Sequence, residues 1–491
     1  MKTKNSLESD FKARNLWSNN RSSAIFPILF KKKDNDLIIN FFNYFKYKNN
    51  IKNIKAVFSI FDKNGNLCSK MTYRNFKENN TFSARSLIEQ IFFEGMLLVE
   101  FISKENLRFP FPAISCFFKS KNLFSVVHSA GRIFNKNELN VKKKYKETNW
   151  ICKFKKNISP FFHYFNGNIE KKIKLKINIH DNEGRLKLSK FVIKKFKPFA
   201  SKIFFIDEIF QLENIKKNYF ISVESSNNNI FPRMIAGNFF KKFDHIEATH
   251  TFSWQEKVDY CPEKIVDIPV SLLNISNFHK LKIKVNNFPT NCKSVFKYNY
   301  RSQKHNESKL SRLLSFNKKN KFFSKDILID DSEKLKTIYF YGKKFPSRFN
   351  TSFIYKIKNS NSDFSTDIAT GAKSIITPEK YSHWGHGILG HGYDTVIMIR
   401  NTKHDLLCED TELNLNIFGF NKLNQTFKLK IKKDSSQNVV IGNLNKTLKN
   451  LKKNKKETIF TWFIKAKKPT LDTIWVSYNK NNSCVLGDHG F

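Results

Sequence analysis

The feature that most constrains the fold is a pattern of short strands that recurs four times along the chain. Each occurrence consists of a strand, a proline turn, a second strand, a short polar turn and a third strand. The four passages are residues 97–132, 219–252, 337–371 and 458–491. Repetition of this kind indicates that one structural unit is used several times, so it guides the interpretation of every single element.

Each passage is preceded by further strand-like runs. Ile173-Lys-Leu-Lys-Ile-Asn-Ile179 and Leu413-Asn-Leu-Asn-Ile417 alternate apolar and polar residues strictly, which is the period-two pattern of a strand with one buried face. Turns such as Asp62-Lys-Asn-Gly65 lie between these runs and are typical of hairpins, because Asp and Gly tolerate positive φ.

A repeat of about 100 residues with roughly seven short strands has the size and pattern of an immunoglobulin-like sandwich. The sequence therefore predicts an all-β fold of four tandem immunoglobulin-like β-sandwich units, antiparallel and of Greek-key type. Four copies of a barrel, or a single large folded sheet, are the alternatives.

The repeats also set the predicted domain boundaries. A short polar N-terminal lead with the first strand occupies residues 1–36. The four sandwich units occupy 37–136, 159–254, 266–372 and 393–491, and the third carries a basic loop insertion at 303–321. A Gly/His-rich linker, 373–392, joins the third unit to the fourth.

The composition accounts for the charge without a nucleic-acid partner. The formal net charge is +45, from 87 Lys and Arg against 42 Asp and Glu. Only 12 of the basic residues are Arg, which is the residue suited to bidentate recognition of phosphates and bases. Lys, Asn, Phe and Ile are abundant together and share A/T-rich codons, so compositional drift explains all four. We expect non-specific adhesion to polyanions at low salt rather than specific nucleic-acid binding.

Cysteine usage and the lack of long apolar runs indicate where the protein resides. The seven cysteines are scattered singly and form no Cys-x-x-Cys pair, which argues against a disulfide framework. The first residues are charged and lack the apolar core of a signal peptide, and no run approaches the roughly 18 apolar residues that cross a bilayer. The sequence predicts a cytoplasmic protein without a transmembrane segment.

Histidines gather where the repeat units end, each in a small polar turn after the last strand. If the units share a fold, these turns lie at the same end of each sandwich, where loops usually supply function. The candidate ligand-binding residues are His128, Arg132, His250, Trp384, Tyr393, Asp488 and His489. The Trp and Tyr would suit stacking on a sugar ring or anchoring a domain interface. Arg233, near a proline turn, is expected to be solvated.

The densest histidine cluster lies in the predicted linker. His383, His386 and His391 alternate there with four glycines, so three imidazoles on a flexible segment could converge on a divalent metal such as zinc. Asp367 and Asp394 flank the cluster as further partners. The spacings match no standard metal motif, and packing of a domain interface without metal is the simpler interpretation.

Catalytic signatures are missing from the sequence. It contains no Walker loop, no GxGxxG after a strand, no GxSxG elbow and no HExxH. The leading prediction is therefore a non-catalytic multidomain β-sandwich protein that binds or organises a glycan or protein partner. The alternative is an enzyme, metal-dependent or not, whose site is assembled between units from the linker and the strand-end turns.

Overall fold

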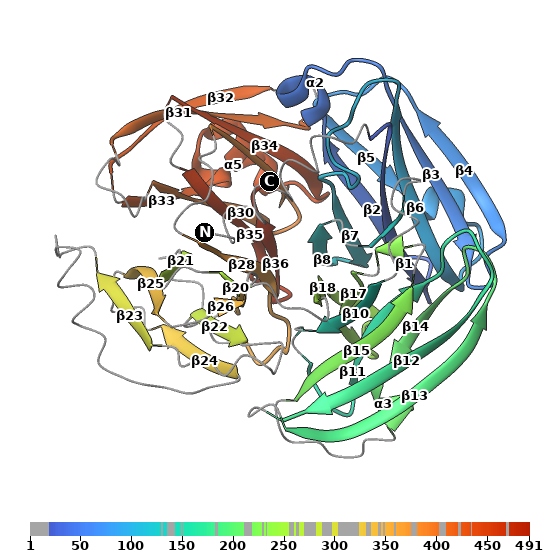
Figure 1. The fold of residues 1–491 in the computed structure, drawn as a ribbon. Helices are drawn as coiled ribbons and strands as arrows, with labels where there is room; N and C mark the ends of the chain where they lie inside the picture. The colour runs from blue at the N-terminus through green and yellow to red at the C-terminus, as the bar shows by residue number, and fades with distance from the viewer. Residues whose placement is uncertain are drawn as a thin grey trace. The chain divides into compact units, whose positions relative to one another are not determined.

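The computed structural model divides the chain into two compact units, residues 1–257 and 258–491, both built mainly from antiparallel strands (Figure 1). The residues that it describes are 19–128, 131–134, 143–148, 150, 152–181, 185–210, 219–227, 230–231, 233–254, 260–261, 265–269, 281–286, 297–302, 324–329, 335–341, 345–346, 349–357, 360–374, 381–401, 409–420, 424–433, 435–467 and 471–491. The predicted loop at 303–321 and residues 1–18 of the predicted lead lie outside them. No helix in the described part is long and apolar enough to cross a membrane.

The first sandwich of the N-terminal unit has two four-stranded sheets, with strand orders β1-β6-β3-β4 and β5-β2-β7-β8. The strands are β1 Arg21–Phe30, β2 Asn35–Phe42, β3 Ile54–Asp62, β4 Leu67–Tyr73, β5 Asn79–Ser83, β6 Phe93–Ser103, β7 Ser115–Ser120 and β8 Leu123–His128. The rings of Phe58 and Phe82 stack across the two sheets with centroids 4.1 Å apart. Phe41 meets Phe101 edge-on at 5.2 Å. Alternating strands thus direct phenylalanines from both sheets into one interior.

The second sandwich of this unit pairs sheets β13-β12-β15-β10-β19 and β14-β11-β17-β18. Its strands are β10 Lys143–Thr148, β11 Ile158–Phe165, β12 Lys171–His180, β13 Leu186–Phe196, β14 Ser201–Phe205, β15 Phe220–Asn227, β17 Ile235–Phe240, β18 His245–His250 and β19 Phe252–Trp254. The strict alternation of β12 buries Ile173, Leu175, Ile177 and Ile179 against Phe162 and Tyr164. A short pair, β9 Arg132–Ile133 and β16 Ile230–Phe231, adds a further ladder.

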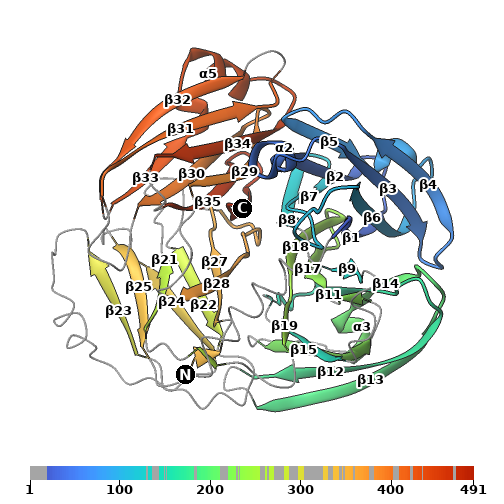
Figure 2. The same cartoon turned by 45° about the horizontal axis from the view of Figure 1, so that its top comes forward.

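The C-terminal unit contains a seven-stranded sheet and a final sandwich (Figure 2). The sheet has the order β23-β25-β21-β28-β27-β22-β24, with β20 and β26 as a separate pair. These strands are β20 Tyr260–Cys261, β21 Ile265–Pro269, β22 Leu281–Asn286, β23 Lys297–Ser302, β24 Ser324–Ile329, β25 Leu335–Tyr341, β26 Phe345–Pro346, β27 Phe349–Ile354 and β28 Ile368–Ser374.

The final sandwich has sheets β29-β34-β31-β32 and β33-β30-β35-β36. Its strands are β29 Ser382–Leu389, β30 Tyr393–Asn401, β31 Thr411–Phe418, β32 Gln425–Ile431, β33 Ser435–Val440, β34 Thr458–Ala466, β35 Leu471–Asn479 and β36 Cys484–His489. Trp462 and Trp475 are fully buried in it. Gly385 lies against both indoles, where an added Cβ would be 2.5 Å from one of them.

One strand order recurs in three sandwiches. In the first sandwich, one sheet has the order first-sixth-third-fourth strand and the other fifth-second-seventh-eighth. The second sandwich repeats this order with β10–β15, β17 and β18. The last sandwich repeats it with β29–β36. The order differs from that of an immunoglobulin constant domain, in which the first and second strands are neighbours in one sheet. Here the first strand of each sandwich pairs with its sixth, which lies far away in sequence.

Short helices join some of the strands, and a strand replaces part of the predicted linker. The helices are α2 Tyr44–Asn49, α3 Ile206–Phe210 and α5 Lys446–Lys452, with 3₁₀ turns η1 Arg85–Leu87 and η3 Ile441–Asn443. Asn445 caps α5 by accepting a hydrogen bond from Leu448 N, and Leu448 is buried. Residues 382–389 of the predicted linker form strand β29, because pairing with β34 satisfies their backbone.

Candidate functional site

Edge strands β8 and β18 of the two N-terminal sandwiches meet at a seam that carries two of the predicted site residues. His128 ends β8 and His250 ends β18, and their ring centroids are 4.3 Å apart in an edge-on arrangement. Both side chains are buried. The structure therefore brings together two strand-end histidines that are 122 positions apart in the sequence.

Arg233 holds one of these imidazoles in place. Its Nη2 atom lies 2.9 Å from Nδ1 and 2.7 Å from Nε2 of His250, and its Nε donates to the carbonyl of Thr251 at 3.2 Å. Arg233 was expected to be a solvated turn residue; it lies just before β17, is half-buried and is hydrogen-bonded to His250. The sequence could not reveal this contact, because a proline turn does not show which residue of another strand lies beside it.

Arg132 lies on β9 and takes a different role. Its guanidinium carbon lies 5.2 Å from the ring centroid of Phe134 and 5.7 Å from that of Phe231, and the side chain is buried. A planar guanidinium stacks well on aromatic faces. The residue packs the β9–β16 ladder.

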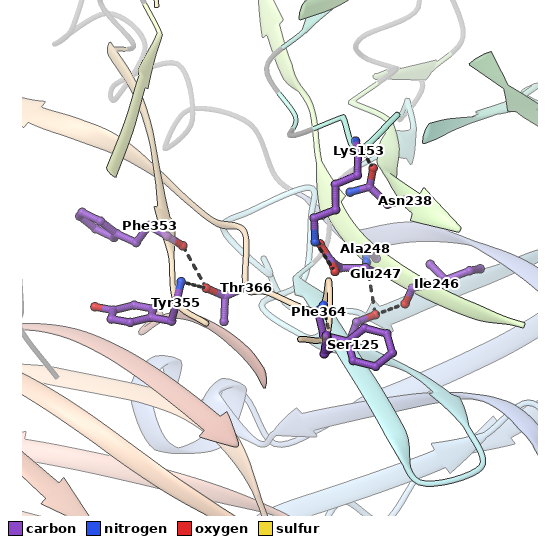
Figure 3. A network of polar contacts seen from close by, with 11 residues as sticks. Ser125, Lys153, Asn238, Ile246, Glu247, Ala248, Phe353, Tyr355, Phe364 and Thr366 are labelled. Atoms are coloured by element: carbon purple, nitrogen blue, oxygen red, sulfur yellow. Dashed lines mark hydrogen bonds and ion pairs between the residues drawn. The ribbon is translucent and has the colours of Figure 1, made fainter. Parts of the chain in front are cut away.

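Two buried carboxylates lie in the second sandwich, one bonded to the residue after His250 and one on β18. Glu147 is fully buried and accepts a hydrogen bond from the hydroxyl of Thr251, whose oxygen also accepts from Met234 N at 2.9 Å. Glu247 on β18 forms an ion pair with Lys153, with Nζ 2.6 Å from Oε1 (Figure 3). Both carboxylates therefore have local partners, and a buried carboxylate is tolerated when it is paired or hydrogen-bonded.

The seam itself is made by hydrogen bonds between two sheet edges. Ser125 of β8 donates its hydroxyl to the carbonyl of Ile246, and the same oxygen accepts from Ala248 N at 3.2 Å (Figure 3). Further along, Ser120 donates to the carbonyl of Phe243 at 2.6 Å. Each edge strand covers the other, which protects backbone groups that would otherwise face outward. The histidine pair sits at one end of this covered seam.

In the C-terminal unit, β29 carries His383 and His386 on opposite faces. His383 Nδ1 lies 3.2 Å from the hydroxyl of Thr473, and His386 Nδ1 lies 3.1 Å from that of Thr461. Both side chains are fully buried. Burial lowers the pKa of His386 to about 3, and the nearby Asp488 acts weakly in the opposite direction. The ring is neutral at physiological pH and is a poor base.

His391 lies elsewhere, in the turn between β29 and β30. Gly390 and Tyr393 exchange backbone hydrogen bonds at 3.3 and 2.9 Å, and the two residues between them have positive φ, 50° at His391 and 83° at Gly392. The imidazole is exposed and contacts the carbonyl of Lys455 at 2.7 Å.

The structure does not bring the three predicted metal ligands together. A strand rises about 3.3 Å per residue, so about 20 Å separates His383 from Leu389 at the end of β29, and His391 lies beyond it in the turn. One metal ion, with ligands about 2 Å away, cannot be shared over that span. The alternation of side chains also separates His383 from His386, which the spacing of histidines in the sequence did not reveal.

The last two predicted residues lie at the end of β36. The Asp488 carboxylate accepts from His489 N at 2.8 Å, and His489 Nδ1 lies 3.0 Å from the carbonyl of Gly490. Phe491 N donates to the carbonyl of Trp384 at 2.9 Å, and the two rings are 5.9 Å apart. This end of the chain closes over β29.

The two aromatic residues predicted to contact a ligand are part of the interior. Trp384 is 3% exposed and Tyr393 is fully buried. Burial raises the pKa of the Tyr393 phenol well above its ordinary value, with Cys484 adding to the effect. Neither ring offers a face to a sugar, so the expected stacking platform does not form.

A separate hydrogen bond in this unit runs from Tyr355 N to the hydroxyl of Thr366 at 2.7 Å (Figure 3).

The described residues form antiparallel β-sandwiches, which defines the class of the protein. No protein-family model matches the chain, and no curated protein matches its sequence. A solved structure with some similarity is a calcium-binding mutant of β-glucuronidase 2 from Bacteroides uniformis. It is 8% identical, with a TM-score of 0.12, and the match covers 49% of this chain and 28% of that one. A TM-score at this level carries no argument about function.

Proposed function

We propose that the protein is a non-catalytic scaffold of four tandem β-sandwich units that binds a protein partner in the cytoplasm. The recurrence of one strand order in three sandwiches supports the tandem arrangement, and the scattered cysteines favour a reducing compartment. The buried Trp384 and Tyr393 make a glycan the second choice of partner.

The observation that carries this proposal is that the histidines are engaged within the fold. His250 is bound by Arg233, while His383 and His386, on opposite faces of β29, each lie beside a threonine hydroxyl. A general base must reach a substrate proton and have a pKa near the working pH. A buried ring with a pKa of about 3, such as His386, fulfils neither condition. We infer that the hydrogen bonds of these buried histidines stabilise the fold.

The test measures the stability of variants at the β8–β18 seam. If Arg233 and His250 are structural, Arg233→Met and His250→Leu should each lower the free energy of unfolding of the N-terminal unit by about 1–3 kcal/mol, because a buried polar group loses its partner. Urea-dependent hydrogen exchange of the β18 amides measures this. His391→Asn is the control, since that ring is exposed and Asn tolerates positive φ.

An enzyme predicts the opposite pattern. Functional residues are often held at a cost in stability, so removing them leaves stability unchanged or raises it. Unchanged unfolding in both variants would therefore contradict the scaffold proposal at this seam.

A ligand site at the histidine pair is the second candidate, favoured by the 4.3 Å separation of the His128 and His250 rings. A ligand held there raises the midpoint of thermal unfolding of the wild type and has no effect on His128→Asn. A panel of carboxylates and uronic acids, tested on both proteins, decides this candidate.

A further inference from the structure

Strand β13 forms a long edge of the second sandwich. It has 11 residues and lies at the end of its sheet, where only β12 pairs with it among the described residues (Figure 1 and Figure 2). One row of its backbone N–H and C=O groups therefore faces away from the sheet. Such an edge is a template for one more strand.

The side chains of β13 are unusual for an edge strand. Four large apolar residues are exposed, with exposed fractions of 41–57%: Leu186, Leu188, Phe191 and Ile193. The corresponding edge strands of the other sandwiches, β4 and β32, contribute only Leu67 to the exposed large apolar residues. Since these four residues lie on both faces of β13, an added strand could bury apolar side chains on either side.

The same segment is strongly basic. Residues 185–197 contain one Arg, five Lys and no acidic residue. Lys195 pairs with Glu170 at 2.5 Å and Lys187 with Asp181 at 3.2 Å, which leaves a net positive charge. The pKa of Lys194 is lowered by burial and by the charges of Lys202 and Lys63, against the attraction of Glu94.

We propose that β13 accepts an extended segment of a partner protein, rich in alternating apolar and acidic residues, as an added strand. The free edge supplies main-chain hydrogen bonds, the exposed apolar residues supply contacts, and the lysines select acidic side chains. This inference rests on the proposed function as a binding protein, and it names the surface and the chemistry of its partner.

Two other occupants fit the surface less well. A second copy of the chain would set lysines against lysines, and like charges directly opposite each other destabilise a strand pair. A single-stranded nucleic acid needs aromatic faces for its bases. Phe191 is the one aromatic ring among the four exposed apolar residues, and Lys174 lies over it at 4.1 Å from its centroid.

The probe is a labelled eight-residue peptide of alternating Val and Glu, with blocked ends, titrated into the full chain. Two further versions carry N-methyl groups on either the odd or the even residues. An added strand uses only one alternating set of its N–H groups toward β13, so one methylated version should bind and the other should lose binding by about tenfold or more. Hydrogen exchange should also show new protection at the β13 amides.

Matched substitutions locate the site on the protein. Phe191→Ser with Ile193→Ser should weaken binding by about tenfold, and Lys194→Glu should weaken it by about threefold or more. The controls lie on the edge strand of the first sandwich, where Leu67→Ser and Lys70→Glu should leave affinity unchanged. All five residues lie on edge strands, and circular dichroism confirms that each variant is folded.

Several results would overturn the proposal. No binding at millimolar peptide, or equal binding of both methylated versions, excludes an added strand. Tighter binding of a (dT)₁₂ oligonucleotide indicates a nucleic-acid surface, and a concentration-dependent dimer lost in the Phe191→Ser, Ile193→Ser variant indicates a second copy. These failures leave the scaffold proposal intact, because that proposal is tested by the stability of Arg233 and His250 variants.

Discussion

His163, on β11, gives the sharpest prediction. The side chain is 1% exposed, neither ring nitrogen has a hydrogen-bond partner within the described part, and burial lowers its pKa from 6.5 to about 3. Below pH 6.5 the unfolded chain binds a proton on this ring, whereas the folded chain does not until the pH approaches 3. The ring therefore has no effect on the free energy of unfolding above pH 6.5. As the pH falls from 6.5 toward 3, it lowers that free energy progressively.

The magnitude follows from the two pKa values. Between pH 7 and pH 5 the ring should remove about 2 kcal/mol from the stability of the second sandwich. His163→Phe should abolish this loss, because Phe is also a planar aromatic ring and cannot be protonated; the ring of Phe165 lies 6.0 Å away. The variant should also be the more stable protein at pH 7, because a buried polar ring is replaced by an apolar one.

The assay is urea-dependent hydrogen exchange of the β11 amides at pH 5, 6 and 7, corrected for the intrinsic effect of pH on exchange. This local measurement suits a chain with several domains, in which a single unfolding transition is not expected. His391→Asn serves as the control, since its ring is exposed. Parallel pH profiles for wild type and His163→Phe would refute the reasoning, because they would mean that the folded ring titrates normally.

Three further outcomes are expected. In Gly387→Ala, the new Cβ would lie 2.6 Å from the Phe460 ring, so thermal unfolding of the last sandwich should show a loss of about 1–3 kcal/mol. Asp394→Asn breaks the ion pair with Lys452, 2.7 Å long, and should loosen α5 in hydrogen exchange; unchanged protection of that helix would contradict the role. Ser125→Ala removes the bridge between β8 and β18 and should cost about 1 kcal/mol in urea unfolding, with no effect on the C-terminal unit.

The sequence by itself determined the class of the fold. Alternating runs such as 173–179 have a period of two, and that period fits a strand with one buried face whatever its neighbours are. The repeated order of strands and turns likewise anticipated several sandwiches in one chain. These features are local, because they depend on residues a few positions apart.

Only the tertiary structure decided which strands pair and what the polar residues do. Glycines at residues 385–392 suggested a flexible linker, yet pairing with β34 makes most of the segment a buried strand. His128 and His250 meet because two sheet edges cover each other, and Arg233 contacts His250 from the segment just before β17. Such contacts join residues that are far apart in the chain, and the free energy that selects them comes from burying whole sheet faces together. No pattern within a single strand carries that information.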